Sequence, residues 1–270
     1  ARLPAGLLSE VSRLRQILPV VGAGALLQPA QSPRRVIGVI AALPLEARCL
    51  VGRKLAPGER VELHHSAGWI QLCGIGREKA FHAAQSLLDA GATALLSWGI
   101  AGGLDPALSA GTLVLPQHVI GADQNVFPVD GEWRSRLQDR VAKHVVTSSG
   151  FLLESLSVIT HLSQKQALAK RIGAAAVDME SAAVAQAAHQ AGVPFMAIRV
   201  IADHATTTVP SSALSAVDAY GQLQILPLVE SLLGHPAELP ALITLGRAFR
   251  AAQKTLSTVA KLAGPGLGIQ

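Results

Sequence analysis

Aromatic and charged residues are scarce in this chain. Of its 270 residues, 3% are aromatic and 15% are charged, whereas 50% are hydrophobic. Lys and Arg number 23 against 18 Asp and Glu, which gives a net charge of +5, and the basic residues concentrate near the termini. Because no basic groove interleaved with aromatics is visible, we do not expect nucleic acid as a partner. The apolar content is sufficient for one large core.

Cysteine is also rare. Cys49 and Cys73 show no C-x-x-C spacing and have no histidine cluster nearby, so neither a disulfide framework nor a metal site is expected. No cofactor is indicated. Two free thiols are typical of a cytoplasmic protein, although the positive net charge leaves peripheral contact with the inner membrane open as an alternative.

Apolar runs of strand character alternate with helical runs, which predicts an α/β fold in three layers, α/β/α, around a central mixed and twisted sheet. Glycine ends two of the expected helices, at Gly91 and Gly192. The expected strands cover residues 36–43, 69–74, 94–98, 111–119, 143–147 and 195–202, and the expected helices cover residues 46–51, 79–90 and 181–191.

Polar residues interrupt the apolar segment Ala176–Asp203. Asp178 and Glu180 are expected at the start of a helix, and Asp203 just past the end of a strand, where ligands bind in open α/β sheets. First-turn dipole partners and caps would also explain the acids. Arg199 lies inside a buried strand, so its charge requires a site carboxylate or an anionic ligand.

Three glycines, Gly99, Gly102 and Gly103, follow the predicted strand 94–98. Glycine lets backbone amides approach a ligand closely, and it also suits a turn that needs positive φ. The run lies at the sheet edge expected for Asp203, and Glu46 follows the first strand in the same way. These positions predict one ligand site at that edge.

Four segments carry a resemblance to a known family: VIGVIAALPLEA, GIGREKA, SWGIAGGLDPALSAGTLVLP and AVDMESAAVAQAAHQAGVPFMAIRVIAD. Together they resemble the superfamily of purine nucleoside phosphorylases and methylthioadenosine/S-adenosylhomocysteine nucleosidases, over residues 36–233. The later segment LVESLLGHPAELPALITLGRAFRAAQKTL resembles the hopanoid-associated phosphorylases. That resemblance implies release of adenine from adenosylhopane, giving ribosylhopane or its phosphate. The alternatives are a methylthioadenosine or adenosylhomocysteine nucleosidase, a purine nucleoside phosphorylase and a non-catalytic nucleoside binder.

The resemblance also implies roles for individual residues. Glu46 matches the general base that activates water, and Asp203 matches the acid that protonates the departing purine at N7. Met179 and Glu180 match the ribose-binding pair, and Phe151 falls where the family stacks an aromatic ring on the base. The remaining predicted substrate-binding residues are Arg199, Ile100, Gly102 and Gly103.

Two departures from the family pattern affect the chemistry. Ala202 replaces the serine that usually precedes the acid, which removes one hydrogen bond to it. Ile100 stands where many relatives have a hydroxyl residue, and a phosphate site needs such donors. This favours water over phosphate as the nucleophile, although Arg48 or Arg77 could still assist an anion.

The ends of the chain are expected to be helical extensions, at residues 1–35 and 234–270, on either side of the domain 36–233. Between residues 239 and 263, apolar residues recur every three or four positions, with Arg247, Arg250 and Lys254 on the opposite face. Such a helix packs against the core or a second subunit, or it lies on an anionic membrane surface. The resemblance implies a homo-oligomer.

Overall fold

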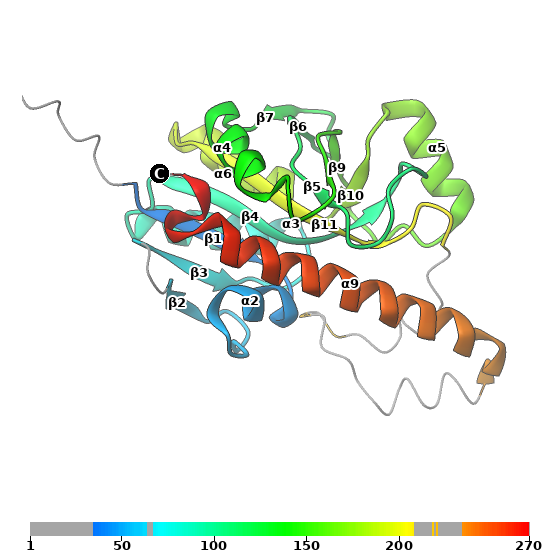
Figure 1. The fold of residues 1–270 in the computed structure, drawn as a ribbon. Helices are drawn as coiled ribbons and strands as arrows, with labels where there is room; N and C mark the ends of the chain where they lie inside the picture. Colours follow the sequence, from blue (N-terminus) through cyan, green and yellow to red (C-terminus); the bar gives the residue numbers. More distant parts are fainter. Residues whose placement is uncertain (1–34, 64–66, 208–217, 219, 221–233, 270) are drawn as a thin grey trace, which may run out of the picture. The chain divides into compact units, whose positions relative to one another are not determined.

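A computed structural model describes residues 35–63, 67–207, 218, 220 and 234–269 (Figure 1). The predicted N-terminal extension falls outside these residues. The described residues, from Arg35 onward, belong to one compact unit.

A mixed sheet forms the centre of this unit. Its long strands run parallel, with β1 between β3 and β4 and with β4 also pairing β11, while β10 joins the far end of β4 antiparallel. The strands are β1 (Ile37–Ala41), β2 (Arg60–Glu62), β3 (Gly68–Leu72), β4 (Ala94–Gly103), β5 (Leu113–Val114), β6 (His118–Ile120), β7 (Val126–Pro128), β8 (Thr147–Ser148), β9 (Leu152–Glu154), β10 (Ala176–Asp178) and β11 (Phe195–Asp203).

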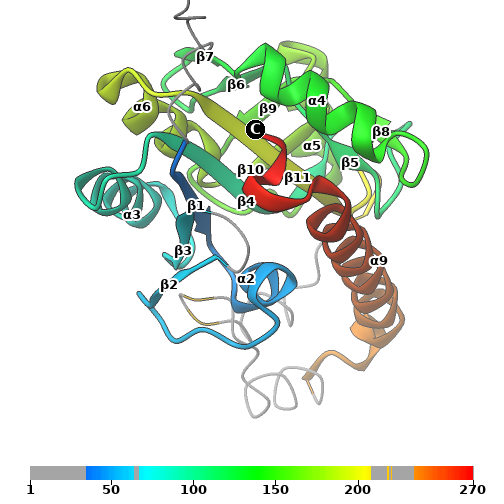
Figure 2. The same ribbon diagram turned by 60° about the vertical axis from the view of Figure 1, so that its left-hand side comes forward.

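Helices cover both faces of the sheet, which confirms the predicted three layers (Figure 2). Alternate side chains of β1 show why, since Val39 belongs to the core cluster that includes residues of α2, α4 and α9, whereas Ile40 belongs to the cluster that includes residues of α3 and α6. The helices are α2 (Pro44–Val51), α3 (Arg77–Asp89), α4 (Gly131–Val141), α5 (Leu162–Ile172), α6 (Ser181–Ala191) and α9 (Leu239–Ala263), with short 3-10 turns η1 (Pro236–Glu238) and η2 (Pro265–Gly268).

Four expected boundaries differ from the structure. The strand predicted over 111–119 is divided into β5 and β6 around Pro116, which has no amide hydrogen for the ladder. Of the strand predicted over 143–147, only residue 147 is extended, at the start of β8. Asp178 ends β10 and Glu180 is the N-cap of α6, so these acids precede the helix. Asp203 is itself the last residue of β11.

The C-terminal helix α9 combines a packed half and an exposed half. Ala252, Leu256 and Val259 are buried against β11, α2 and α4, which confirms the prediction of a helix that packs on the core. In the first half, by contrast, Leu239 and Ile243 are each 49% exposed. Within the described ranges, no helix is long and apolar enough to cross a membrane.

Candidate active site

A pocket of about 200 Å³ lies where β1, β4, β10 and β11 end. The predicted residues Glu46, Ile100, Gly102, Met179, Glu180 and Asp203 all line it. Parallel strands bring their carboxyl ends to one edge of a sheet, so residues up to 157 positions apart meet there. The other lining residues are Ala42, Leu43, Ile75, Ala101, Ser155, Ser157, Val158, Ile159, Lys165, Val177, Asp178, Ala202 and Phe249.

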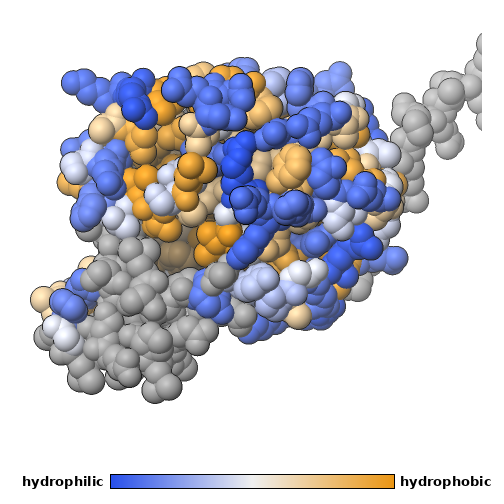
Figure 3. All heavy atoms as spheres, turned by 180° about the vertical axis from the view of Figure 1, so that it is seen from behind, coloured by the Kyte–Doolittle hydropathy of each residue, from blue (hydrophilic) through white to orange (hydrophobic). Residues whose placement is uncertain are grey.

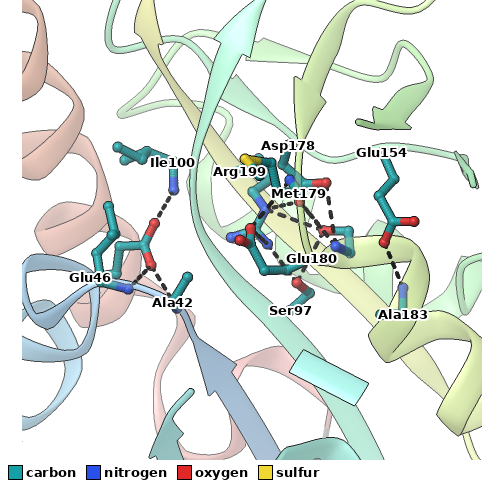
Figure 4. A network of polar contacts seen from close by, with 12 residues as sticks. Ala42, Glu46, Ser97, Ile100, Glu154, Asp178, Met179, Glu180, Ala183 and Arg199 are labelled. Carbon is teal, nitrogen blue, oxygen red and sulfur yellow. Dashed lines mark hydrogen bonds and ion pairs between the residues drawn. The ribbon is translucent and has the colours of Figure 1, made fainter. Parts of the chain in front are cut away.

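Glu46 is held by the backbone on both sides of the pocket (Figure 4). Its Oε2 accepts hydrogen bonds from the amides of Ala42, at 2.9 Å, and Leu43, at 2.8 Å, and its Oε1 accepts one from Ile100, at 2.8 Å. Burial raises the pKa of the carboxyl, while Arg199 and these amides act in the opposite direction. A fixed carboxylate with a raised pKa is suited to accept a proton near neutral pH.

At Gly99, the side chains of Arg199 and Glu46 approach the backbone closely. None of the three glycines has a positive φ, and all three belong to β4, so the expected turn is a continuation of the strand. A Cβ at Gly99 would collide with Nη1 of Arg199 and with the carboxylate of Glu46. Close packing of these two charged groups on the backbone therefore explains the glycine.

Gly99→Ala should displace Glu46 and Arg199. We expect kcat to fall on the order of 10²-fold, since shifts of about 1 Å at a reacting group have such effects, and the free energy of unfolding to fall by about 1–3 kcal/mol. Steady-state kinetics and urea unfolding measure the two quantities. Gly131→Ala is the matched control, because nothing lies within 4 Å of a Cβ added there. Equal activity of both variants would contradict the proposed crowding.

Arg199 is 1% exposed and organises the acids of the site (Figure 4). Its Nε donates to Asp178 at 2.6 Å, and its Nη2 donates to Oγ of Ser97 at 2.7 Å and lies 3.9 Å from Glu180. Asp178 also accepts a hydrogen bond from the hydroxyl of Ser181. Asp178 thus neutralises the charge of Arg199, for which the sequence alone did not identify a partner. The N–H groups of Nη1, close to Glu46, have no acceptor among the described residues.

Glu180 lies between this network and the pocket. Its Oε1 accepts the amide of Gly76 at 2.9 Å, and its Oε2 accepts that of Met179 at 3.3 Å. Burial, and then the negative charge of Asp178, raise the pKa of Glu180 to about 8, against the opposing effect of Arg199. A carboxyl group in this position can accept or donate hydrogen bonds to hydroxyl groups of a ligand.

Asp203 lines the pocket next to Gly102. Its Oδ2 is paired with Nζ of Lys165, a contact that no feature of the sequence had indicated. Burial raises the pKa of Asp203, and Lys165 acts in the opposite direction. The pair therefore places the carboxylate of Asp203 and the ammonium group of Lys165, which can supply a proton, together at one side of the pocket.

The predicted substrate-binding residues Arg199, Phe151 and Gly103 lie outside the pocket lining, as does Arg77. Phe151 is 38% exposed and its ring contacts His118 edge-on, so the structure does not bring it to the predicted base-stacking position. Gly103 contacts the backbone after Asp203, where a Cβ would be crowded. Arg77, considered as an aid to anion binding, pairs with Glu154 instead.

Four polar residues of the site were not predicted: Lys165, Ser97, Ser181 and the direct role of Asp178 as the partner of Arg199. Asp178 and Ser181 flank the predicted Glu180, so proximity in sequence was a usable signal for them. Among the described residues, no group of three or more His, Cys, Asp or Glu side chains is arranged to hold a metal ion.

Sequence comparison identifies relatives of this chain. The family model described as phosphorylase superfamily matches residues 37–222. The 5'-methylthioadenosine/S-adenosylhomocysteine nucleosidase of Tolumonas auensis is 32% identical over 164 residues, which is 52% of this chain and 69% of that protein. The protein of the same name from Shewanella baltica is 29% identical over 182 residues, which is 59% of this chain and 77% of that protein.

Solved structures share the fold. The 5'-methylthioadenosine/S-adenosylhomocysteine nucleosidase of Neisseria meningitidis, in complex with methylthio-immucillin-A, superposes with a TM-score of 0.62 at 20% identity, over 85% of this chain and 98% of that one. The futalosine hydrolase of Helicobacter pylori superposes with a TM-score of 0.60 at 18% identity, over 84% and 98%. The chain therefore belongs to the phosphorylase superfamily, and it is an enzyme that cleaves N-glycosidic bonds of nucleosides.

Proposed function

We propose that this enzyme hydrolyses the N-glycosidic bond of adenosylhopane, releasing adenine and ribosylhopane. Glu46 is the general base that takes a proton from the attacking water. Arg199 lies close to Glu46 at Gly99, where its positive charge stabilises the carboxylate. Glu180 and Met179 bind the ribose, and Asp203 protonates N7 of the base, so that adenine leaves without an unfavourable negative charge.

The hydrogen bond from the amide of Ile100 to Glu46 is the observation that favours water over phosphate as the nucleophile. A phosphate bound at this point would need the amide of Ile100 as a donor, but Glu46 already accepts that hydrogen bond. The negative charge of Glu46 would also repel the phosphate. Neither arginine considered for anion binding lines the pocket, since Arg48 is exposed and Arg77 is paired with Glu154. Hydrolysis is therefore the reaction that the site supports best.

Apolar side chains at the pocket support a lipid-linked substrate. Phe249 from α9 lines the pocket, and Leu239 and Ile243 earlier on the same helix are exposed. Val158 both lines the pocket and is 47% exposed. Hydrophobic side chains also gather around a hollow on the face seen in Figure 3. Exposed apolar groups that continue from a pocket suit a long apolar 5' substituent.

A 5'-methylthioadenosine or S-adenosylhomocysteine nucleosidase is the second candidate. The names of the bacterial relatives favour it. The same base, acid and ribose-binding residues would serve this reaction, and only the environment of the 5' substituent would differ. Membrane contact through residues 239–263 and assembly into a homo-oligomer belong to the first proposal.

Adenine release from two substrates tests the proposal. Purified protein is incubated with adenosylhopane in detergent or with methylthioadenosine, each with and without phosphate, and the products are separated by chromatography. We expect release from adenosylhopane, independent of phosphate, with a free sugar as product. Release from methylthioadenosine alone would assign the soluble substrate, and a sugar 1-phosphate product would overturn hydrolysis.

A further inference from the structure

Lys165 is a buried lysine on a helix that otherwise exposes its charges. It is 1% exposed, whereas Lys170 and Arg171 on the same helix α5 are exposed. Its Nζ donates to Oδ2 of Asp203 and to the carbonyl oxygens of His204 and Thr207, each at 3.1 Å. All three ammonium hydrogens therefore have acceptors. Such complete pairing offsets the cost of burying the charge, and it places a cation directly behind the candidate acid.

The two oxygens of Asp203 have different surroundings. Oδ2 is bonded to Lys165, while Oδ1 lies beside Gly102, whose backbone lines the pocket. Oδ1 is thus the oxygen placed toward a ligand. Because Ala202 precedes the acid, no neighbouring hydroxyl at that position shares in holding the carboxyl group. Lys165 performs that task from another element of the fold.

A carboxylate paired with an ammonium group has no proton to give to a leaving base, so the proton must be supplied. We propose that Lys165 is a positioning residue for N-glycosidic cleavage that orients Asp203 and passes it the proton destined for the purine. The inference rests on the proposed adenine-releasing function. It adds a residue that acts through Asp203 and does not itself touch the substrate.

The proton and electron balance of the step is complete. Nζ of Lys165 transfers a proton to Oδ2 of Asp203, rotation of the carboxyl group about its Cβ–Cγ bond turns the protonated oxygen toward the ligand, and that same proton passes to N7 of the purine. The electron pair of the bond between C1' and N9 moves onto the base, which leaves as neutral adenine. Water forms the new bond to C1', and Glu46 takes the proton of that water. Exchange with solvent then returns a proton to Lys165 and removes one from Glu46.

Lys165→Met tests this role with two kinds of leaving group. Adenine release is measured from adenosylhopane and from methylthioadenosine, and nitrophenol release is measured from 4-nitrophenyl riboside. Nitrophenolate leaves as an anion and needs no acid. We expect kcat for adenine release to fall on the order of 10²-fold, as is typical for loss of acid catalysis, and nitrophenol release to change less than about threefold. Lys170→Met, on the exposed face of α5, should leave both unchanged.

The dependence of kcat on pH is a second readout. Without the ammonium group, Asp203 must take its proton from solvent, so the residual kcat of Lys165→Met should rise as the pH falls, more steeply than that of the wild type. If the methionine variant does not fold, Lys165→Gln takes its place, since it keeps a donor but has no charge.

The outcomes separate three cases. Unchanged adenine release in Lys165→Met would overturn the inference. An equal loss with both leaving groups and at every pH would also overturn it, because it would assign Lys165 to stability alone. Failure of the wild type to release adenine from either nucleoside would instead contradict the proposed function.

Discussion

Glu46→Gln should reduce kcat for adenine release by on the order of 10²–10⁴, the range usual for loss of general acid–base catalysis. Glu46 accepts hydrogen bonds from three backbone amides, of Ala42, Leu43 and Ile100. The glutamine amide cannot take a proton from water, and its NH2 group would face at least one of these N–H donors. Both the chemistry and the position of the side chain are therefore lost.

Steady-state kinetics with the better nucleoside substrate measures this effect, and urea unfolding shows whether the variant remains folded. Glu78→Gln is the matched control, since Glu78 is exposed in the first turn of α3. It should keep the activity of the wild type. A Glu46→Gln variant with kcat within tenfold of the wild type would exclude Glu46 as the base.

Arg199→Met should lower the free energy of unfolding by about 3–5 kcal/mol, the usual cost of removing one partner from a buried ion pair. Asp178, whose side chain is 2% exposed, would lose its 2.6 Å hydrogen bond from Nε, and Glu180 would lose the positive charge that opposes the rise in its pKa. No other cation lies within 4 Å of either carboxylate in the described part of the chain.

The pH dependence of this loss has a defined sign. Without Arg199, the pKa of the buried Glu180 carboxyl rises further in the folded state, because the charge that opposes this rise is lost. Groups with raised folded pKa values stabilise the fold at low pH and lose that contribution as the pH increases. Urea unfolding at about pH 5 and 8 should therefore show the larger difference from wild type at the higher pH. Arg171→Met removes an exposed charge from α5 and should stay within about 0.5 kcal/mol of the wild type at both values. A difference from the wild type that does not grow between about pH 5 and 8 would contradict this sign.

The strand and helix order followed from local patterns because apolar periodicity and glycine stops are local signals. Gly192 ends α6 with φ of 65°, as its position in the sequence predicted. Boundaries were less accurate where the chain breaks a pattern for tertiary reasons. The run 111–119 reads as one strand, yet β5 pairs with β11 while β6 pairs with β9. Which neighbour a short strand adopts depends on contacts distant in sequence, which a local pattern does not contain.

For the site, the sequence by itself determined the strand-end positions of Glu46 and Asp203 and the need of Arg199 for a partner, since a buried charge requires compensation. Only the tertiary structure decided which partner each group has. Asp178 neutralises Arg199, and Lys165, 38 residues before Asp203, pairs with that acid. The structure also placed Phe151 against His118. The two ion pairs arise where β11 meets β10 and α5, whereas Phe151 and His118 lie next to β9 and on β6. The physical reason is that side-chain contacts between elements depend on packing in three dimensions. Periodicity in sequence specifies only which face each residue occupies.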